Sequence, residues 1–191
     1  MPAIILAAGV SRRLGQPKQL VRVGGETLLE RTIRVVREAG AQPVFVVLGA
    51  HRERIAAAVD FERVRTVENL EWEEGIASSI RAGVATVRQE IPHAAAMLLL
   101  VCDQPRLMAE HLRNLIAEQE GFAEVAIVAS EYAGIAGIPA IFPASEFARL
   151  MSLRGDIGAK SLLRNPCCSM RTVAFDGGEV DVDTTADLEG L

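Results

Sequence analysis

Cysteine, histidine and aromatic residues are scarce in this chain of 191 residues, and each scarcity excludes a class of protein. The three cysteines, Cys102, Cys167 and Cys168, are odd in number and form no C-x-x-C pair, so we expect small, reduced side chains rather than a disulfide framework or a metal site. The three histidines are scattered without partners at metal-ligand spacing, which argues against zinc. Only 4% of the residues are aromatic although 50% are hydrophobic, a composition typical of a layered α/β protein.

Long hydrophobic runs and excess positive charge are also missing. No apolar run reaches the roughly 20 residues that a membrane-spanning helix needs, and Met1-Pro2-Ala3 lacks the charged start and cleavage site of a signal peptide. The net charge of −5 argues against nucleic acid as a general partner. We therefore expect a cytoplasmic protein that binds neither nucleic acid nor membrane.

Two common nucleotide-binding motifs are absent as well. The chain has no G-x-G-x-x-G of the dinucleotide-binding type. It has no G-x-x-x-x-G-K-[ST] either, because Gly15 is followed by Gln16 and Lys18 comes after a proline.

What is present is a regular alternation of apolar runs and amphipathic stretches, which predicts βαβ units and a mostly parallel sheet in an α/β fold. The predicted strands are 3–7, 43–48, 64–67, 95–101 and 125–129, and the predicted helices are 28–39, 52–59, 78–90 and 109–120. Further on, 133–143 is expected to be a loop that enters a short strand, followed by helices at 146–151 and 156–163 and a strand at 170–175.

No linker, repeat or low-complexity segment divides the chain. We expect a single domain over 1–191, with a nucleotide-binding part in 1–130 and an acceptor-side part in 131–191. Ligands of parallel α/β sheets bind at the carboxyl ends of the strands, and the polar motifs described next all follow predicted strands.

The first motif runs from Gly9 to Lys18, directly after the first predicted strand. Glycines let backbone amides approach phosphate oxygens, and Arg or Lys neutralises their charge, so the loop suits a nucleoside triphosphate. A solvated basic turn is the alternative for this loop taken alone.

Carboxylates form the second and third motifs. Asp103 follows a buried apolar strand and is placed to hold a hard cation such as Mg²⁺, although such an Asp can equally cap a turn. Asp181 and Asp183 alternate along an extended segment, so that both carboxylates point to one side, and Thr184 can cap a short helix. An acidic, capped C-terminal tail is the alternative.

Two glycine-containing segments complete the pattern. Ser78 and Ser79 follow Gly75 and are natural caps for the next helix. Glycines flank Asp156 in a turn whose helix could hold an anion at its N-terminus, although apolar packing and a turn explain it equally well.

These motifs, in this order, resemble a family of nucleotidyltransferases. Residues 6–18 fit the signature L-A-A-G-x-S-x-R-[ML]-G-x-x-K throughout. Within the MobA-like superfamily the chain is most similar to the molybdenum cofactor cytidylyltransferases. The resemblance implies a three-layer, Rossmann-like nucleotidyltransferase fold, with helices on both faces of a mostly parallel sheet.

The resemblance also implies roles for individual residues. Arg13, Lys18 and Asp103 would be catalytic, and Asp103 and Asp183 would hold Mg²⁺. Thr185 stands where the family usually has proline, which removes no ligand. The nucleotide would be bound by Leu6, Ala7, Ala8, Gly9, Ser11, Gly75, Ser78 and Ser79, and the acceptor by Gly137, Pro139, Asp156 and Lys160.

The reaction implied by the resemblance is transfer of CMP from CTP to the phosphate of molybdopterin, with release of pyrophosphate and with a molybdoenzyme as the eventual recipient. A guanylyl- or sugar-phosphate nucleotidyltransferase is one alternative. A non-catalytic nucleotide-binding factor for molybdoenzyme maturation is another. Arg81, on the helix after Ser79, is expected to matter far less than Lys18 for phosphate binding.

Overall fold

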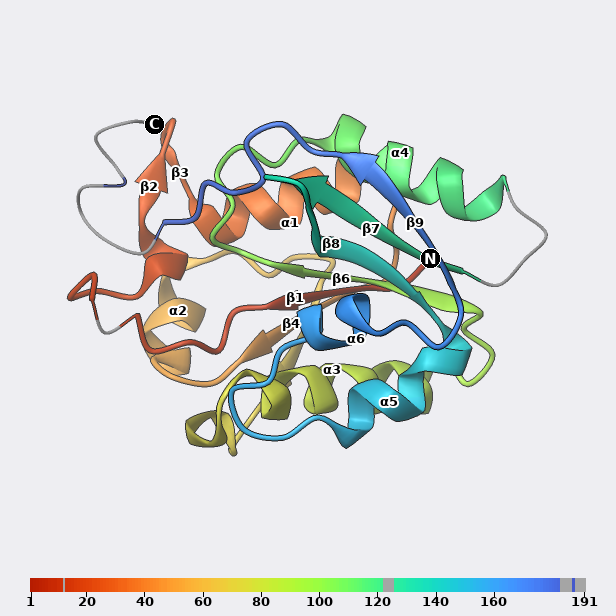
Figure 1. Ribbon diagram of the computed structural model, residues 1–191. Helices are drawn as coiled ribbons and strands as arrows, with labels where there is room; N and C mark the ends of the chain where they lie inside the picture. The colour runs from red at the N-terminus through yellow and green to blue at the C-terminus, as the bar shows by residue number, and fades with distance from the viewer. Residues whose placement is uncertain (12, 122–125, 183–186, 188–191) are drawn as a thin grey trace.

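A computed structural model describes residues 1–11, 13–121, 126–182 and 187, and its centre is a twisted sheet (Figure 1). The strands run in the order β5-β4-β1-β6-β8-β7-β9. Their bounds are β1 Ala3–Leu6, β4 Val44–Leu48, β5 Arg65–Glu68, β6 Ala96–Val101, β7 Ala126–Tyr132, β8 Ile135–Pro143 and β9 Ser169–Ala174. All neighbours are parallel except β8, which is antiparallel to both β6 and β7.

Helices cover both faces of the sheet, which confirms the predicted three-layer α/β architecture. Figure 1 shows α1 (Leu28–Glu38) and α4 (Ala109–Glu120) on one face. The other face carries α3 (Ile76–Glu90), α5 (Phe147–Ser152) and α6 (Lys160–Arg164), while α2 (Arg52–Ala58) lies at the end of the sheet. Among the described residues, no helix is long and apolar enough to cross a membrane.

The central strands are apolar throughout because both of their faces are covered. Every residue of β1 and β4 is buried, and all but the last residue of β6. Parallel strands in this position read as continuous hydrophobic runs rather than as alternating patterns. This is why the sequence shows them clearly.

Helix α1 has well-defined ends. The Thr27 side chain accepts a hydrogen bond from the Glu30 amide while the Glu30 carboxylate accepts one from the Thr27 amide, a reciprocal capping box. At the other end the amides of Gly40 and Ala41 donate to the carbonyls of Arg37 and Val36. Gly40 has φ +84° there and ends the helix in a Schellman motif.

The expectation of a loop over the first part of 133–143 was wrong, since β8 occupies Ile135–Pro143 in full. Its apolar residues lie between β6 and β7, and this burial, rather than local sequence, makes the segment extended. Gly137 is needed there because a Cβ atom would come within 2.4 Å of the Tyr132 ring carbon Cζ.

Two helices and one hairpin also differ from prediction. Helix α3 begins at Ile76 rather than Ser78, and α6 spans Lys160–Arg164 rather than the predicted 156–163. A short hairpin of β2 (Arg22–Val23) and β3 (Glu26–Thr27) was not predicted. Its two-residue turn is Gly24-Gly25 with φ +62° and +93°, and paired glycines are a known hairpin signal that was overlooked.

Strand register brings two of the predicted motifs together. Leu6 at the end of β1 is paired with Val101 at the end of β6. The strands are parallel, so the Gly9 loop and Asp103 leave the same edge of the sheet side by side.

Candidate active site

A cleft of about 450 Å³ opens at this edge of the sheet. The loop after β1 forms one wall, and the segment that leads into α3 forms the other. Its lining residues are Leu6, Ala8, Gly9, Val10, Ser11, Lys18, Trp72, Glu73, Gly75, Ile76, Ser79, Val101, Asp103 and Asp156. The cleft thus brings together the predicted phosphate loop, the aspartate after β6 and the predicted nucleotide-binding residues Gly75 and Ser79.

The buried Gln19 side chain holds the loop in shape. Its Nε2 donates to the carbonyl oxygens of Ala7 at 2.7 Å and Gly9 at 3.1 Å. Ser11, in the left-handed region at φ 57°, accepts a hydrogen bond from the Lys18 amide through its Oγ at 2.9 Å. The loop is therefore closed on itself, which leaves its cleft-facing edge preformed.

Lys18 forms an ion pair with Asp103 across the floor of the cleft. The Lys18 Nζ donates to the Asp103 Oδ2, although 85 residues separate them in the sequence. The two side chains are 20% and 14% exposed, so the pair is shielded from bulk water. The other carboxylate oxygen, Asp103 Oδ1, is buried without a hydrogen-bond partner.

The Oδ1 atom of Asp103 suits a divalent cation. A buried carboxylate oxygen without a donor is costly, and a hard cation such as Mg²⁺ or Mn²⁺ binds through one or two carboxylates together with substrate phosphates. Asp183, the second predicted ligand, lies outside the described residues. Its neighbour Val182 donates a backbone hydrogen bond to the Asp103 carbonyl at 2.9 Å, so the C-terminal segment reaches the same place.

Cys102 next to this pair is an inert thiol. Burial raises its pKa to about 12, and the negative charge of Asp103 adds to the shift. A cysteine that stays protonated at neutral pH is a poor nucleophile. Cys102 is therefore not a candidate nucleophile at this site.

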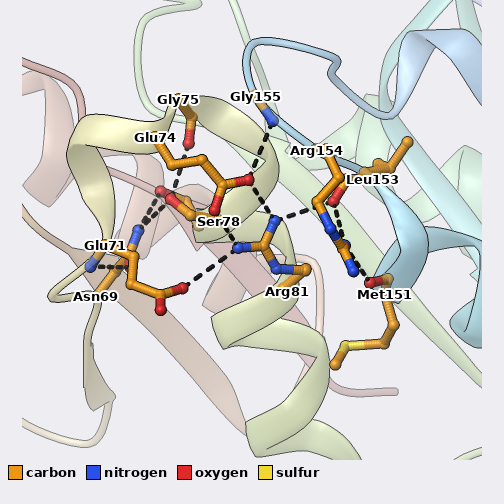
Figure 2. A network of polar contacts seen from close by, with 11 residues as sticks. Asn69, Glu71, Glu74, Gly75, Ser78, Arg81, Met151, Leu153, Arg154 and Gly155 are labelled. Carbon is orange, nitrogen blue, oxygen red and sulfur yellow. Dashed lines mark hydrogen bonds and ion pairs between the residues drawn. The ribbon is translucent and has the colours of Figure 1, made fainter.

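Ser78 and Ser79 lie within the first turn of α3 and do not cap it as predicted, because the N-cap position is Gly75, which has no side chain to accept from the helix amides. Asn69 Nδ2 donates instead to the Oγ atoms of Ser78 at 2.8 Å and Ser79 at 3.0 Å. Ser78 Oγ in turn donates to the Gly75 carbonyl at 2.8 Å (Figure 2). The result is a fixed first turn of α3, with Ser79 and Gly75 on the cleft wall.

A second cleft of about 330 Å³ adjoins the first. Its lining residues are Leu6, Ile76, Ile80, Leu99, Val101, Asp103, Gln104, Tyr132, Ile138, Asp156, Gly158, Ala159, Lys160 and Asp181. Asp103 and Asp156 line both clefts, and the Lys160 Nζ lies 5.5 Å from the centre of the Tyr132 ring. Two ligands could therefore meet at Asp103.

Several predicted contact residues lie behind the cleft walls. Ala7 and Ser78 are buried, and they accept hydrogen bonds from Gln19 and Asn69 respectively. Gly137 and Pro139 support Tyr132 and Ser130, whose Oγ donates to the Pro139 carbonyl at 2.6 Å. Arg13 is exposed on the loop.

The sequence analysis assigned no role to Gln19, Trp72 or Gln104. Gln104 is 5% exposed, and its Nε2 donates to the carbonyls of Ile138 and Gly178, which ties the Asp103 loop to β8 and to the C-terminal segment. Only their position beside a motif residue could have drawn attention to them. A glutamine in a loop carries no periodic signal of burial.

Comparison with known proteins agrees with this geometry. The model of the MobA-like NTP transferase domain matches residues 3–172. The purine catabolism protein PucB of Bacillus subtilis is 30% identical over 97% of this chain and 93% of its own length. The nicotine blue oxidoreductase of Paenarthrobacter nicotinovorans is 33% identical over 59% of this chain, but the match spans only 54% of that protein.

Two further relatives bear on chemistry. A protein of Opitutus terrae named "probable molybdenum cofactor guanylyltransferase" is 35% identical over 58% of this chain and 52% of its own length. The crystal structure of Rv0371c from Mycobacterium tuberculosis H37Rv is 32% identical, with a TM-score of 0.84 over 99% of this chain and 95% of its own. A complex of Rv0371c with manganese matches with a TM-score of 0.81 at 29% identity, over 100% of this chain and 96% of its own. With its fold, its clefts and these relatives, the chain belongs to the MobA-like NTP transferase family.

Proposed function

We propose that this nucleotidyltransferase moves CMP from CTP to the phosphate of a molybdopterin-type cofactor. An oxygen of the acceptor phosphate attacks the α-phosphorus, the bond between the α-phosphorus and its bridging oxygen breaks, and pyrophosphate leaves with the electron pair. The single observation that carries the proposal is the meeting of two clefts at Asp103, with Lys18 on the floor of the first. The name of the Opitutus terrae relative supports a cofactor of this kind as acceptor.

The phosphate side of the reaction would use the Gly9 loop. Loop amides and Lys18 would bind the triphosphate, and Arg13 would neutralise charge on the leaving pyrophosphate. Mg²⁺ bound by Asp103 and Asp183 would stabilise the negative charge that develops in an in-line displacement. The manganese complex of Rv0371c supports a divalent cation in this role.

The acceptor would occupy the second cleft, with its phosphate toward Asp103 and near Lys160. A phosphate monoester is largely ionised at neutral pH, so it needs no general base. Catalysis then consists of alignment and charge stabilisation, which are the main means of accelerating phosphoryl transfer.

Base choice would fall to the segment before α3. Ser79 already accepts a hydrogen bond from Asn69, so its hydroxyl is oriented, and Gly75 brings backbone to the cleft wall. These groups would read a pyrimidine edge, whereas a purine would collide or leave buried polar groups unpaired. Guanylyl transfer is the alternative that the Opitutus terrae relative favours.

The test is to incubate the protein with Mg²⁺, molybdopterin and each of CTP, GTP, ATP and UTP, and to measure pyrophosphate. We expect release with CTP only when the acceptor is present. Faster release with GTP would replace the cytidylyl assignment by the guanylyl one. No release with any nucleotide would favour a non-catalytic maturation factor.

Two variants sharpen this test. Asp103→Asn keeps the size of the side chain but removes its charge, and kcat should fall by more than about tenfold, a barrier change above ~1.4 kcal/mol. Ser79→Ala should lower kcat/KM for CTP more than for GTP and so erode the preference, since one lost hydrogen bond costs about 1–3 kcal/mol. Equal losses for CTP and GTP would remove Ser79 from base recognition.

A further inference from the structure

A network of polar contacts joins the start of α3 to the loop 153–156 that follows α5 (Figure 2). Arg81 is at its centre, with a side chain that is only 15% exposed. Its Nη1 donates to the Glu74 Oε1 at 2.7 Å and to the Leu153 carbonyl at 2.9 Å. Its Nη2 donates to the other oxygen of Glu74 and, at 3.3 Å, to the Glu71 carboxylate.

Gly155 is bound by its amide and by its carbonyl. Its amide donates to the Glu74 Oε1 at 3.0 Å, and its carbonyl accepts from the Ala77 amide at 3.1 Å. Gly75 packs directly on it, because a Cβ atom at Gly75 would lie 2.6 Å from the carbonyl carbon and oxygen of Gly155. The loop is thus held against the first turn of α3.

The charges of this network stay on over the physiological pH range. Hydrogen bonds from Arg81 and from the Gly155 amide lower the pKa of Glu74 to about 2. Only an arginine side chain can donate to all of these acceptors at once, because its planar guanidinium carries five N–H donors, whereas lysine donates from a single nitrogen.

The residue after Gly155 is Asp156, which lines both clefts. Within the described part of the chain, neither Arg81 nor Glu74 lines these two clefts, so they act on any ligand only through the loop. The wall of the first cleft that contains Gly75 and Ser79 is fixed by separate hydrogen bonds. Asn69 donates to Ser78 and Ser79, and Ser78 donates to the Gly75 carbonyl.

We propose that Arg81 and Glu74 are positioning residues. They hold the loop 153–156, whose Asp156 forms the wall between the two clefts, and so align the acceptor against the bound nucleotide. Their loss should therefore impair acceptor use and turnover while nucleotide affinity is preserved. The inference rests on the proposed function, because it assigns the second cleft to the acceptor.

The test compares Arg81→Lys and Glu74→Gln with Arg88→Lys. Arg88 is exposed on the same helix, so its substitution makes the same chemical change outside the network. Three quantities are measured in each protein. They are the Kd of CTP with Mg²⁺ from the fluorescence of Trp72, the kcat and the KM for molybdopterin, and amide hydrogen exchange in residues 153–158. Trp72 is the one tryptophan of the chain and lines the first cleft.

We expect the Kd of CTP to stay within about twofold while kcat/KM for the acceptor falls by about tenfold or more, because small misplacements of reacting groups are costly. Exchange in 153–158 should rise in both network variants and stay unchanged in Arg88→Lys. The guanidinium ion should partly restore turnover to Arg81→Ala but not to Asp103→Asn. Wild-type exchange and acceptor kinetics in both network variants would overturn the inference, as would a Kd for CTP that rises as much as the acceptor KM.

Failure of the proposed function gives a different result. Wild-type protein would then release no pyrophosphate with CTP and molybdopterin. Hydrogen exchange would still decide whether Arg81 and Glu74 hold the wall, since that measurement needs no turnover.

Discussion

The ion pair between Lys18 and Asp103 joins two residues that are central to the proposed function. Lys18 occupies one oxygen of the carboxylate, and the other oxygen is buried. A divalent cation can therefore reach Asp103 fully only after Lys18 has moved, and a triphosphate supplies the charge that would draw Lys18 away. We therefore expect the metal and the nucleotide to bind cooperatively rather than independently.

This arrangement gives an uncommon expectation for Lys18→Met. In the absence of nucleotide the variant should bind Mn²⁺ more tightly than wild type, by about tenfold or ~1.4 kcal/mol, while its affinity for CTP falls. Mn²⁺ titration followed by electron paramagnetic resonance measures the free ion directly. Lys160→Met removes the same charge from the adjoining cleft without touching Asp103, and should change Mn²⁺ affinity much less.

Adding Asp103→Asn to the Lys18→Met protein should abolish the gain. If Lys160→Met increases Mn²⁺ binding as strongly as Lys18→Met does, general electrostatics rather than the ion pair controls access to the carboxylate.

At the scale of the elements, the stability of α1 depends on the residues at its N-terminus. It packs on the sheet through Leu29, Ile33 and Val36, and it begins with the Thr27–Glu30 capping box described above. The box satisfies two amides that the helix itself cannot bond. Helix α1 begins directly after the β2–β3 hairpin.

Thr27→Ala should lower the free energy of unfolding by about 1 kcal/mol, the usual cost of losing an N-cap side chain. Urea denaturation followed by circular dichroism measures the change. Thr86→Ala is the matched control, because the Thr86 hydroxyl only donates to the Ala82 carbonyl within α3. Mid-helix bonds of that kind add little stability, so a loss in Thr86→Ala equal to that in Thr27→Ala would argue against the cap.

At the scale of the whole molecule, a buried histidine joins α4 to the side of the sheet formed by β7 and β9. His111 of α4 stacks on Phe175, with ring centres 4.4 Å apart, and its Nε2 lies 2.7 Å from Ser130 Oγ. Burial lowers the pKa of His111 to about 4. The unfolded chain therefore takes up a proton near the ordinary histidine pKa of about 6.5, where the folded protein does not.

Protons bound only by the unfolded state make stability rise with pH. The contribution of His111 is thus complete above about pH 6.5 and is lost as the pH falls toward 4, for a total of about 3 kcal/mol. His111→Gln should flatten the dependence of the unfolding free energy on pH between these values. His93→Gln, an exposed control, should leave it as in wild type. A slope that persists in His111→Gln would assign the dependence to other groups.

The sequence by itself determined the class of fold and the family. Runs such as 3–7, 43–48 and 95–101 are apolar because their strands are covered on both faces, and that pattern is local enough to read directly. The Gly9 loop and Asp103 were equally visible, since both follow such strands and carry the residue types that phosphates and cations require.

Only the tertiary structure decided how these parts meet. The length and antiparallel direction of β8 depend on its neighbours β6 and β7. The first turn of α3 depends on Asn69, which donates hydrogen bonds to the hydroxyl oxygens of Ser78 and Ser79 in place of a helix cap. In the sequence, Arg81 and Arg88 are two charges on one helix. Only the folded structure distinguishes them, because Arg81 contacts Glu74 and also the Leu153 carbonyl, 72 residues away, and a contact over such a sequence distance leaves no local pattern.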